Sequence, residues 1–274
     1  MTNAMTPATA IFKYTPGRSP LVVSMPHVGT HIPPGIACRL SAPALRVPDT
    51  DWHLDRLYDF LGELDASVLQ ATHSRYVVDL NRPPDDASLY PGQDTTGLVP
   101  LDTAEKQSLY NGVPPSMAEI AERRATYWRP YHDRLAARLQ EIKAQHGYAL
   151  LWDAHSIKAE LPRYFKGRLH DLNIGTADGA SCGAGLGELL LDRARARARY
   201  SSILNGRFKG GYITRHYGQP ADSLHAVQLE LSWITYMNQS DPYEFREDLA
   251  QSIRPVLRGL MEAYLSWGAA HAGT

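Results

Sequence analysis

The sequence predicts an α/β fold in which a mixed, mostly parallel sheet is covered by helices on both faces, giving three layers. Short apolar runs alternate with long amphipathic stretches along the 274 residues, as expected for buried strands connected by helices. No Ser/Gly tract, charge block or internal repeat divides the chain. We therefore expect one domain over residues 1–274, with roughly the first ten residues poorly ordered.

Six apolar runs are the expected strands. They are short, rich in aliphatic residues and followed by Pro, Gly or polar residues that end a strand. Their nearly continuous apolar character is typical of strands that are buried on both faces. The runs are LVVSM (21–25), SVLQAT (67–72), YVVDL (76–80), YALLWD (148–153), HDLNIG (170–175) and AVQLEL (226–231).

Three amphipathic stretches are the expected helices. Apolar residues recur at helical spacing over residues 54–64. A longer helix over residues 116–147 begins with a capping box, because Ser116 is followed three positions later by Glu119. The last helix covers residues 244–267 and closes the chain.

Charge and cysteine content exclude several classes of protein. A net charge of -1 gives no broad attraction for nucleic acid or an anionic membrane, so a small molecule is the expected partner. Two cysteines, no leader segment and no apolar run near ~18 residues fit a reduced, cytoplasmic protein that is neither exported nor membrane-inserted. The run RARARARY (193–200) is expected to be a solvated helix surface, since alternate positions spread around a helix axis.

Two histidines follow the first expected strand. His27 and His31 are four residues apart, a spacing that on a helix would form a metal-binding pair. Pro26, Gly29 and the Pro33-Pro34 pair exclude a helix, so the histidines lie on a loop at the carboxyl end of a strand. In open α/β sheets, ligands bind at that edge.

Polar residues follow other expected strands as well, in the segments LLWDAHS, YVVDLNRPP and VQLELSW, and in VPDTDWHLD before an expected helix. Two histidines and a carboxylate from separate strand ends suit a catalytic zinc ion, which takes three protein ligands and leaves one position for water. The candidate site residues in these four segments are Asp49, Asp51, His53, Asp79, Asn81, Arg82, Asp153, His155, Ser156 and Glu230.

Five segments resemble the N-formylglutamate amidohydrolase family, also called the N-formylglutamate deformylases. They are, in order, PHVGTHIP, SRYVVDLNRPP, WDAHS, GGYITRHYGQP and HAVQLELSWITYM, and the resemblance runs from about Leu21 to Met237. It implies a zinc-dependent hydrolase with a zinc carboxypeptidase-like α/β fold. The implied reaction is cleavage of N-formyl-L-glutamate to L-glutamate and formate in histidine degradation.

The family is distantly similar to the aspartoacylases, and this similarity implies roles for four residues. An Asn-Arg pair, here Asn81 and Arg82, would bind a substrate carboxylate. A further arginine, here Arg75, would polarise the scissile carbonyl and stabilise the oxyanion. A glutamate, here Glu230, would act as general base and then as general acid.

One departure concerns the metal ligands. The first metal motif of these relatives is HxxE, but the residue three positions after His27 is Thr30, so the carboxylate ligand must come from elsewhere. Asp51 is the expected choice, and His31 and His53 are its rivals. The bound ion is expected to be zinc, with cobalt or nickel as alternatives, and Asp153 is expected either to orient a ligand imidazole or to anchor a loop. The full expected ligand set is His27, Asp51 and His155.

A substrate with two carboxylates requires a second cation. We expect Arg215 in GGYITRHYG, on a loop that Gly210 and Gly211 would allow to close. Two other functions stay open: the same site acting on another N-acyl acidic amino acid or a small peptide, and a non-catalytic protein that binds acidic amino acids. Glu230 favours the enzyme, because a binding protein has no need of a buried carboxylate facing its ligand. The sequence makes no prediction of the oligomeric state.

Overall fold

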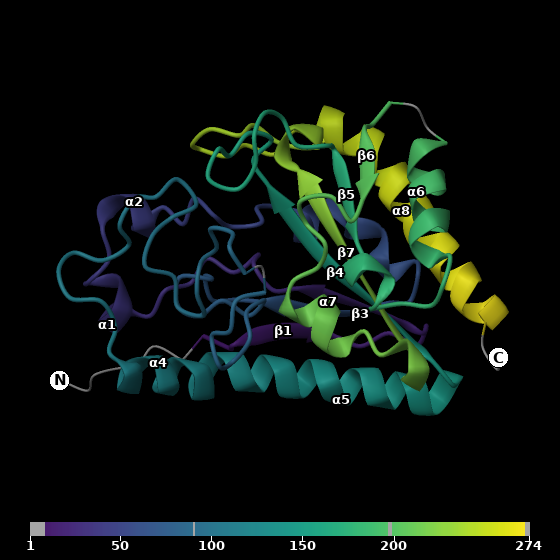
Figure 1. The fold of residues 1–274 in the computed structure, drawn as a ribbon, viewed down its shortest axis with the longest axis horizontal. Coiled ribbons are helices and arrows are strands. Elements are labelled where there is room, and N and C mark those ends of the chain that lie inside the picture. Colours follow the sequence, from purple (N-terminus) through teal and green to yellow (C-terminus); the bar gives the residue numbers. More distant parts are fainter. Residues whose placement is uncertain (1–8, 90, 197–198, 272–274) are drawn as a thin grey trace, which may run out of the picture.

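A computed structural model describes residues 9–89, 91–196 and 199–271. Its centre is a seven-stranded sheet with the order β1-β3-β2-β4-β7-β5-β6 (Figure 1). The expectation of a poorly ordered N-terminus falls almost wholly on residues 1–8, which lie outside the described residues. Within the described ranges, no helix is both long and apolar enough to cross a lipid bilayer.

Four parallel strands form the middle of the sheet, and three shorter strands lie at its edges. The four are β3 (Ser67–Ala71), β2 (Leu21–Met25), β4 (Ala149–Ile157) and β7 (Leu224–Ser232). At one edge, β1 (Phe12–Thr15) runs antiparallel to β3. At the other, β5 (Leu172–Gly175) runs antiparallel to β7 and parallel to β6 (Ser202–Leu204). The predicted mixed, mostly parallel sheet is confirmed.

Helices cover both faces of the sheet and complete the three predicted layers (Figure 1). Alternate residues of a strand point to opposite faces, so Leu150 and Trp152 of β4 belong to one buried cluster and Leu151 to another. The helices α6 (Leu186–Arg195) and α8 (Glu247–His271) pack on the first face. On the second face, α5 (Arg129–His146) and α7 (Tyr212–Tyr217) pack.

The long predicted helix is present but is not regular along its length. It consists of α4 (Met117–Arg123), one π-helical turn (Arg124–Trp128) and α5. The hydroxyl of Ser116 accepts a hydrogen bond from the backbone N–H of Glu119, as the capping box requires. Glu119 does not complete the box, because its carboxylate pairs with Arg39 and Arg123.

The predicted helix over residues 54–64 divides into two short pieces. These are α3 (Leu54–Leu57) and a 3-10 turn (Asp59–Gly62), because Tyr58 between them leaves the helical region with φ -91° and ψ 36°. Two further short helices, α1 (Pro34–Ala37) and α2 (Ala42–Leu45), precede them. The remaining 3-10 turns are Ala177–Gly179, Pro220–Asp222 and Trp233–Thr235.

The strand predicted at residues 76–80 is wrong. Tyr76, Val77, Val78 and Leu80 are buried as their apolar character requires, but the segment is irregular and has no neighbouring strand among the described residues. Its carbonyl groups are instead satisfied by side chains. The guanidinium of Arg123 donates to the carbonyl oxygen of Val77 at 3.3 Å. This segment leads directly into the residues of the site.

Candidate active site

A cavity opens at the carboxyl ends of the central parallel strands, where polar side chains of the chain converge. His155 lies near the end of β4 and is paired in register with Glu230 of β7, so both side chains project from the same face of the sheet. His27 follows β2 by two residues. All three line the cavity together with Asp51. The strand-end prediction therefore holds: parallel strands bring their carboxyl ends, and these residues, to one place.

Three buried side chains in this cavity offer a set of ligand atoms for one metal ion. One ligand atom each from His27, Asp51 and His155 lies within 4.8 Å of the other two. A carboxylate oxygen of Asp51 is 3.0 Å from Nδ1 of His155 and 3.7 Å from Nδ1 of His27. The backbone N–H of Asp51 donates to the carbonyl oxygen of His27 at 3.0 Å, which fixes the loop before α3 beside the first histidine.

The opposite nitrogen of each histidine faces a fully buried carboxylate. Nε2 of His27 lies 2.7 Å from Asp79, and Nε2 of His155 lies 3.1 Å from Asp153. Where a carboxylate accepts the Nε2 proton, as Asp79 can from His27, Nδ1 is left as the nitrogen able to bind a metal and the ring orientation is fixed. Nε2 of His155 also lies 2.9 Å from the amide nitrogen of Asn81, which is a hydrogen-bond donor. Both Nδ1 atoms point toward Asp51, so the arrangement has the form of a carboxylate-supported metal site.

Charge in the buried site also favours a divalent cation. Asp51, Asp79 and Asp153 are buried together beside Glu230, and Arg75 forms an ion pair with Asp79. Buried carboxylates are stable only when cations or hydrogen-bond donors compensate them. The geometry of the donors and the excess of negative charge therefore both fit a metal ion bound by His27, Asp51 and His155.

The protonation of the two histidines differs when no ion is bound. Burial and the positive charge of Arg75 lower the pKa of His27, although Asp79 and Asp51 act in the opposite direction. Burial alone would lower the pKa of His155 too, but Asp153 and Asp51 outweigh it and raise that pKa well above its usual value. Burial raises the pKa of Glu230 to about 8, against the opposing charges of His155 and Arg75.

The two rival ligands lie elsewhere. His31 forms an isolated bridge with His73 and packs edge-on against it, with 4.8 Å between the ring centroids. Nε2 of His53 is 2.7 Å from the carbonyl oxygen of Tyr243. Of the three candidates for the third ligand, Asp51 is the one that the structure groups with His27 and His155.

Arg75 and Arg82 line the cavity and lie on either side of Asp79 in the sequence. The guanidinium of Arg75 donates to Asp79 at 2.6 Å, and the same carboxylate supports His27, so Arg75 is held next to a proposed ligand. Arg82 donates to the carbonyl oxygens of Thr96 and Asn81 and to the hydroxyl of Thr96. These acceptors are neutral, so they position the guanidinium without neutralising its charge.

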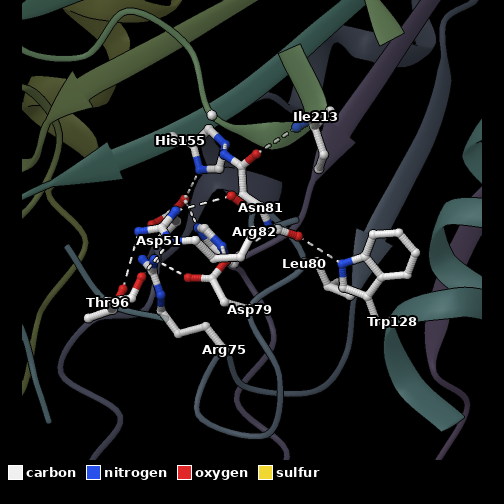
Figure 2. Close-up of polar contacts among 12 residues, drawn as sticks. Asp51, Arg75, Asp79, Leu80, Asn81, Arg82, Thr96, Trp128, His155 and Ile213 are labelled. Atoms are coloured by element: carbon white, nitrogen blue, oxygen red, sulfur yellow. Dashed lines mark hydrogen bonds and ion pairs between the residues drawn. The ribbon is translucent and has the colours of Figure 1, made fainter. Parts of the chain in front are cut away.

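Asn81 joins the site to the start of α7. Its Nδ2 is 2.9 Å from Nε2 of His155, and its Oδ1 accepts from the backbone N–H of Ile213 at 2.9 Å (Figure 2). Gly211 packs so closely against Asn81 that a Cβ there would lie 2.2 Å from Nδ2. Gly211 is therefore needed for close packing, which differs from the mobile loop expected from the glycine pair.

The long helix holds the segment that carries these residues. Nε1 of Trp128 donates to the carbonyl oxygen of Arg82 at 3.0 Å, and Nε2 of His132 lies 2.8 Å from that of Leu80. Figure 2 shows the indole of Trp128 directed at this segment from the side opposite His155. Arg124, one helical turn earlier, donates to the carbonyl oxygen of Pro84 at 2.7 Å. Side chains of one helix thus replace the missing strand neighbour along residues 76–84.

Comparison with known proteins agrees with this geometry. A sequence model described as N-formylglutamate amidohydrolase matches residues 19–237, which is most of the chain. The chain belongs to the N-formylglutamate amidohydrolase family. The resemblance found in the sequence motifs is thereby confirmed.

Relatives in this family cover the chain almost completely. The N-formylglutamate deformylase of Pseudomonas aeruginosa is 51% identical over 259 residues, covering 94% of this chain and 97% of the relative. The N-formylglutamate deformylase of Pseudomonas putida is 49% identical over 260 residues, with the same coverage of both chains. The crystal structure of N-formylglutamate amidohydrolase from Ralstonia eutropha is 26% identical and superimposes with a TM-score of 0.78, over 94% of this chain and 97% of the other.

Two site residues depart from what the sequence led us to expect for an N-formylglutamate amidohydrolase. Arg215 is not among the residues that line the cavity in the described part of the chain. Its Nε donates to the carbonyl oxygen of Gly210, just before α7, at 2.8 Å. Arg207, on the loop before α7, lines the cavity instead. Asp79 was named among the polar residues that follow the expected strands, but no function was predicted for it, although its position two residues before the Asn-Arg pair was a usable signal.

Proposed function

We propose that the chain hydrolyses the formamide bond of N-formyl-L-glutamate and releases L-glutamate and formate. The observation that carries this proposal is the cavity in which a buried His-Asp-His group, Glu230 and two arginines face one another. The family relatives named as N-formylglutamate deformylases support the choice of substrate. Placement of the reaction in histidine degradation stays a prediction.

We infer that His27, Asp51 and His155 hold one zinc ion, with cobalt or nickel as alternatives. Two imidazoles and one carboxylate form a donor set typical of catalytic zinc sites. When bound, the ion supplies Lewis-acid activation of water at neutral pH. The residues of the chain then have three tasks: to move protons, to stabilise negative charge and to orient the substrate.

Glu230 is the proposed proton carrier. It lines the cavity and is the register partner of His155, so its carboxylate lies next to the proposed ligands. As general base it takes a proton from the attacking water, and as general acid it gives a proton to the departing amine nitrogen.

Two arginines are proposed to bind different charges. Arg75 is held by Asp79 close to the histidine ligands, where it would stabilise the oxyanion that forms as water adds to the formyl carbon. Arg82 would bind a carboxylate that is already charged in the substrate, through the bidentate geometry that a guanidinium allows. Asn81 lines the same cavity, and its part in binding that carboxylate stays a prediction.

Release of formate from N-formyl-L-glutamate by purified, zinc-loaded protein tests this function directly. Glu230→Gln should retain one zinc ion per chain and lose at least about 100-fold in kcat, because an amide cannot carry the proton. Zinc content and thermal unfolding of the variant serve as controls for the fold. Turnover within a few fold of the wild type would remove Glu230 from the mechanism. Absence of formate release by the wild type would instead refute the proposed reaction.

A further inference from the structure

Four cationic side chains line the cavity, and they differ in what holds them. Arg75 and Lys158 each form an ion pair with a carboxylate of the protein. Arg82 is held by neutral acceptors of residues 81 and 96. Nε of Arg207 likewise donates to a neutral acceptor, the carbonyl oxygen of Tyr164, at 2.6 Å. A hydrogen bond of this kind fixes the direction of a guanidinium in the cavity wall.

Tyr164 and Phe208, both in the cavity wall, surround Arg207. The guanidinium carbon of Arg207 lies 5.8 Å from the ring centroid of Tyr164 and 5.4 Å from that of Phe208, within range of cation-π attraction. Burial raises the pKa of Tyr164, while the positive charges of Arg75, Arg163 and Arg82 oppose that rise. The tyrosine that holds Arg207 therefore also interacts with the charges of Arg75 and Arg82, which line the same cavity.

The loop that carries Arg207 is tied to the rest of the site. It ends at Gly211, whose backbone N–H donates to the side chain of Gln228 at 2.7 Å. Gly211 also packs directly on Asn81, the neighbour of Arg82. The loop cannot shift without disturbing Asn81, so Arg207 and Arg82 belong to one connected wall.

The geometry points to Arg207, and not Arg215, as the residue that binds the side-chain carboxylate of the substrate. This assignment rests on the proposed function, because it requires a substrate with a second carboxylate. Arg82 then takes one carboxylate and Arg207 the other, while Arg75 stays with Asp79 beside the histidines. A neutral amide in place of the side-chain carboxylate would lose the charge-assisted hydrogen bonds that a guanidinium forms.

The test compares N-formyl-L-glutamate with N-formyl-L-glutamine, which has nearly the same shape but no second charge. For the zinc-loaded wild type, kcat/KM should be higher for the glutamate compound. Arg207→Ala should lower kcat/KM for that compound about 10- to 100-fold and leave the glutamine compound nearly unchanged. Arg207→Lys should fall in between, since it keeps the charge and loses the fork.

Two further variants separate this assignment from its alternatives. Lys209→Ala, two positions along the same loop and paired with Asp178, should keep the wild-type preference, which controls for general damage to the loop. Arg215→Ala should keep it as well. If Arg215→Ala removes the preference and Arg207→Ala does not, Arg207 is not the carboxylate ligand.

Binding of the product gives a readout that does not depend on turnover. Titration of L-glutamate and L-glutamine into zinc-loaded protein should show tighter binding of glutamate, and Arg207→Ala should remove this preference. If the alanine variant does not fold, Arg207→Gln takes its place. Unchanged preference in the variant would overturn the assignment. A wild type that binds glutamate selectively but releases no formate would refute the proposed reaction and leave the role of Arg207 standing.

Discussion

Replacement of Asp79 by asparagine should weaken metal binding and destabilise the metal-free protein. Asp79 has no exposed surface and accepts three hydrogen bonds: from Nε2 of His27 at 2.7 Å, from Arg75 at 2.6 Å and from the backbone N–H of Asn81 at 2.9 Å. Asparagine has nearly the same shape but one carboxylate oxygen fewer. Its NH2 group must then face either the His27 proton or the Arg75 guanidinium, so that two donors oppose each other.

Two magnitudes follow from these contacts. Loss of the carboxylate behind a ligand histidine typically lowers metal affinity 10- to 100-fold, which corresponds to about 1.4 to 2.7 kcal/mol. Removal of one partner of a buried ion pair costs about 3 to 5 kcal/mol, because the other charge stays buried without compensation. Asp79→Asn should therefore raise the zinc Kd by one to two orders of magnitude. It should also lower the unfolding free energy of the metal-free protein by about 3 to 5 kcal/mol.

Competition with a zinc-binding dye measures the first effect, and urea unfolding of the metal-free protein measures the second. Asp153→Asn is the corresponding change beside the other histidine, since its carboxylate lies 3.1 Å from Nε2 of His155. It should also weaken zinc binding, and it should lower the stability of the metal-free protein as well, because Asp153 raises the pKa of His155 and is its counter-charge. A zinc Kd for Asp79→Asn within twofold of the wild type would refute the inferred support of His27.

Two other perturbations should have measurable effects. His132 is buried and its pKa is lowered to about 3, chiefly by burial, so below its unfolded pKa of 6.5 the unfolded chain binds a proton that the folded chain does not. The unfolding free energy should therefore fall as the pH is lowered, by about 2 kcal/mol between pH 7 and pH 5 from this group. Urea unfolding of His132→Gln should show a correspondingly smaller decrease between these pH values. The same decrease in the variant as in the wild type would contradict the assignment. Gly211→Ala forces a Cβ to within 2.2 Å of Asn81 and should lower both thermal stability and kcat/KM, whereas Gly112→Ala, at an open but positive-φ position, should cost stability alone.

The central strands could be predicted from sequence because burial on both faces leaves a continuous apolar run. The run at residues 21–25 coincides with β2, and those at 67–72 and 226–231 differ from β3 and β7 by one or two residues at the ends. Edge strands lack this signal. β1 alternates half-buried and exposed residues, and β6 has three residues, so both were missed.

Burial alone does not distinguish a strand from an irregular segment, which explains the error at residues 76–80. What distinguishes them is the location of the hydrogen-bond partners, and here these are Arg123 and His132, some 50 residues later in the chain. The same reasoning applies to the site. Three residues of the site follow or end strands, and that fact alone predicts that they lie together: His27, His155 and Glu230. In contrast, the direction of the Arg215 side chain on α7 and of the Arg207 side chain on its loop depends on tertiary packing, which no local sequence pattern encodes.

The π-helical turn between α4 and α5 changes the angular phase of the long helix. A regular α-helix rotates about 100° per residue, so Arg123 and Tyr131, eight residues apart, would differ by about 80°. One residue taken up by the wider turn reduces this difference to about 20°, and both side chains are buried, at 2% and 0% exposure. Deletion of one residue within 124–128 would restore regular winding and turn Arg123 toward solvent. The carbonyl groups at residues 76 and 77 would then lose their donor, so a relative that lacks the extra residue must support this loop in a different way.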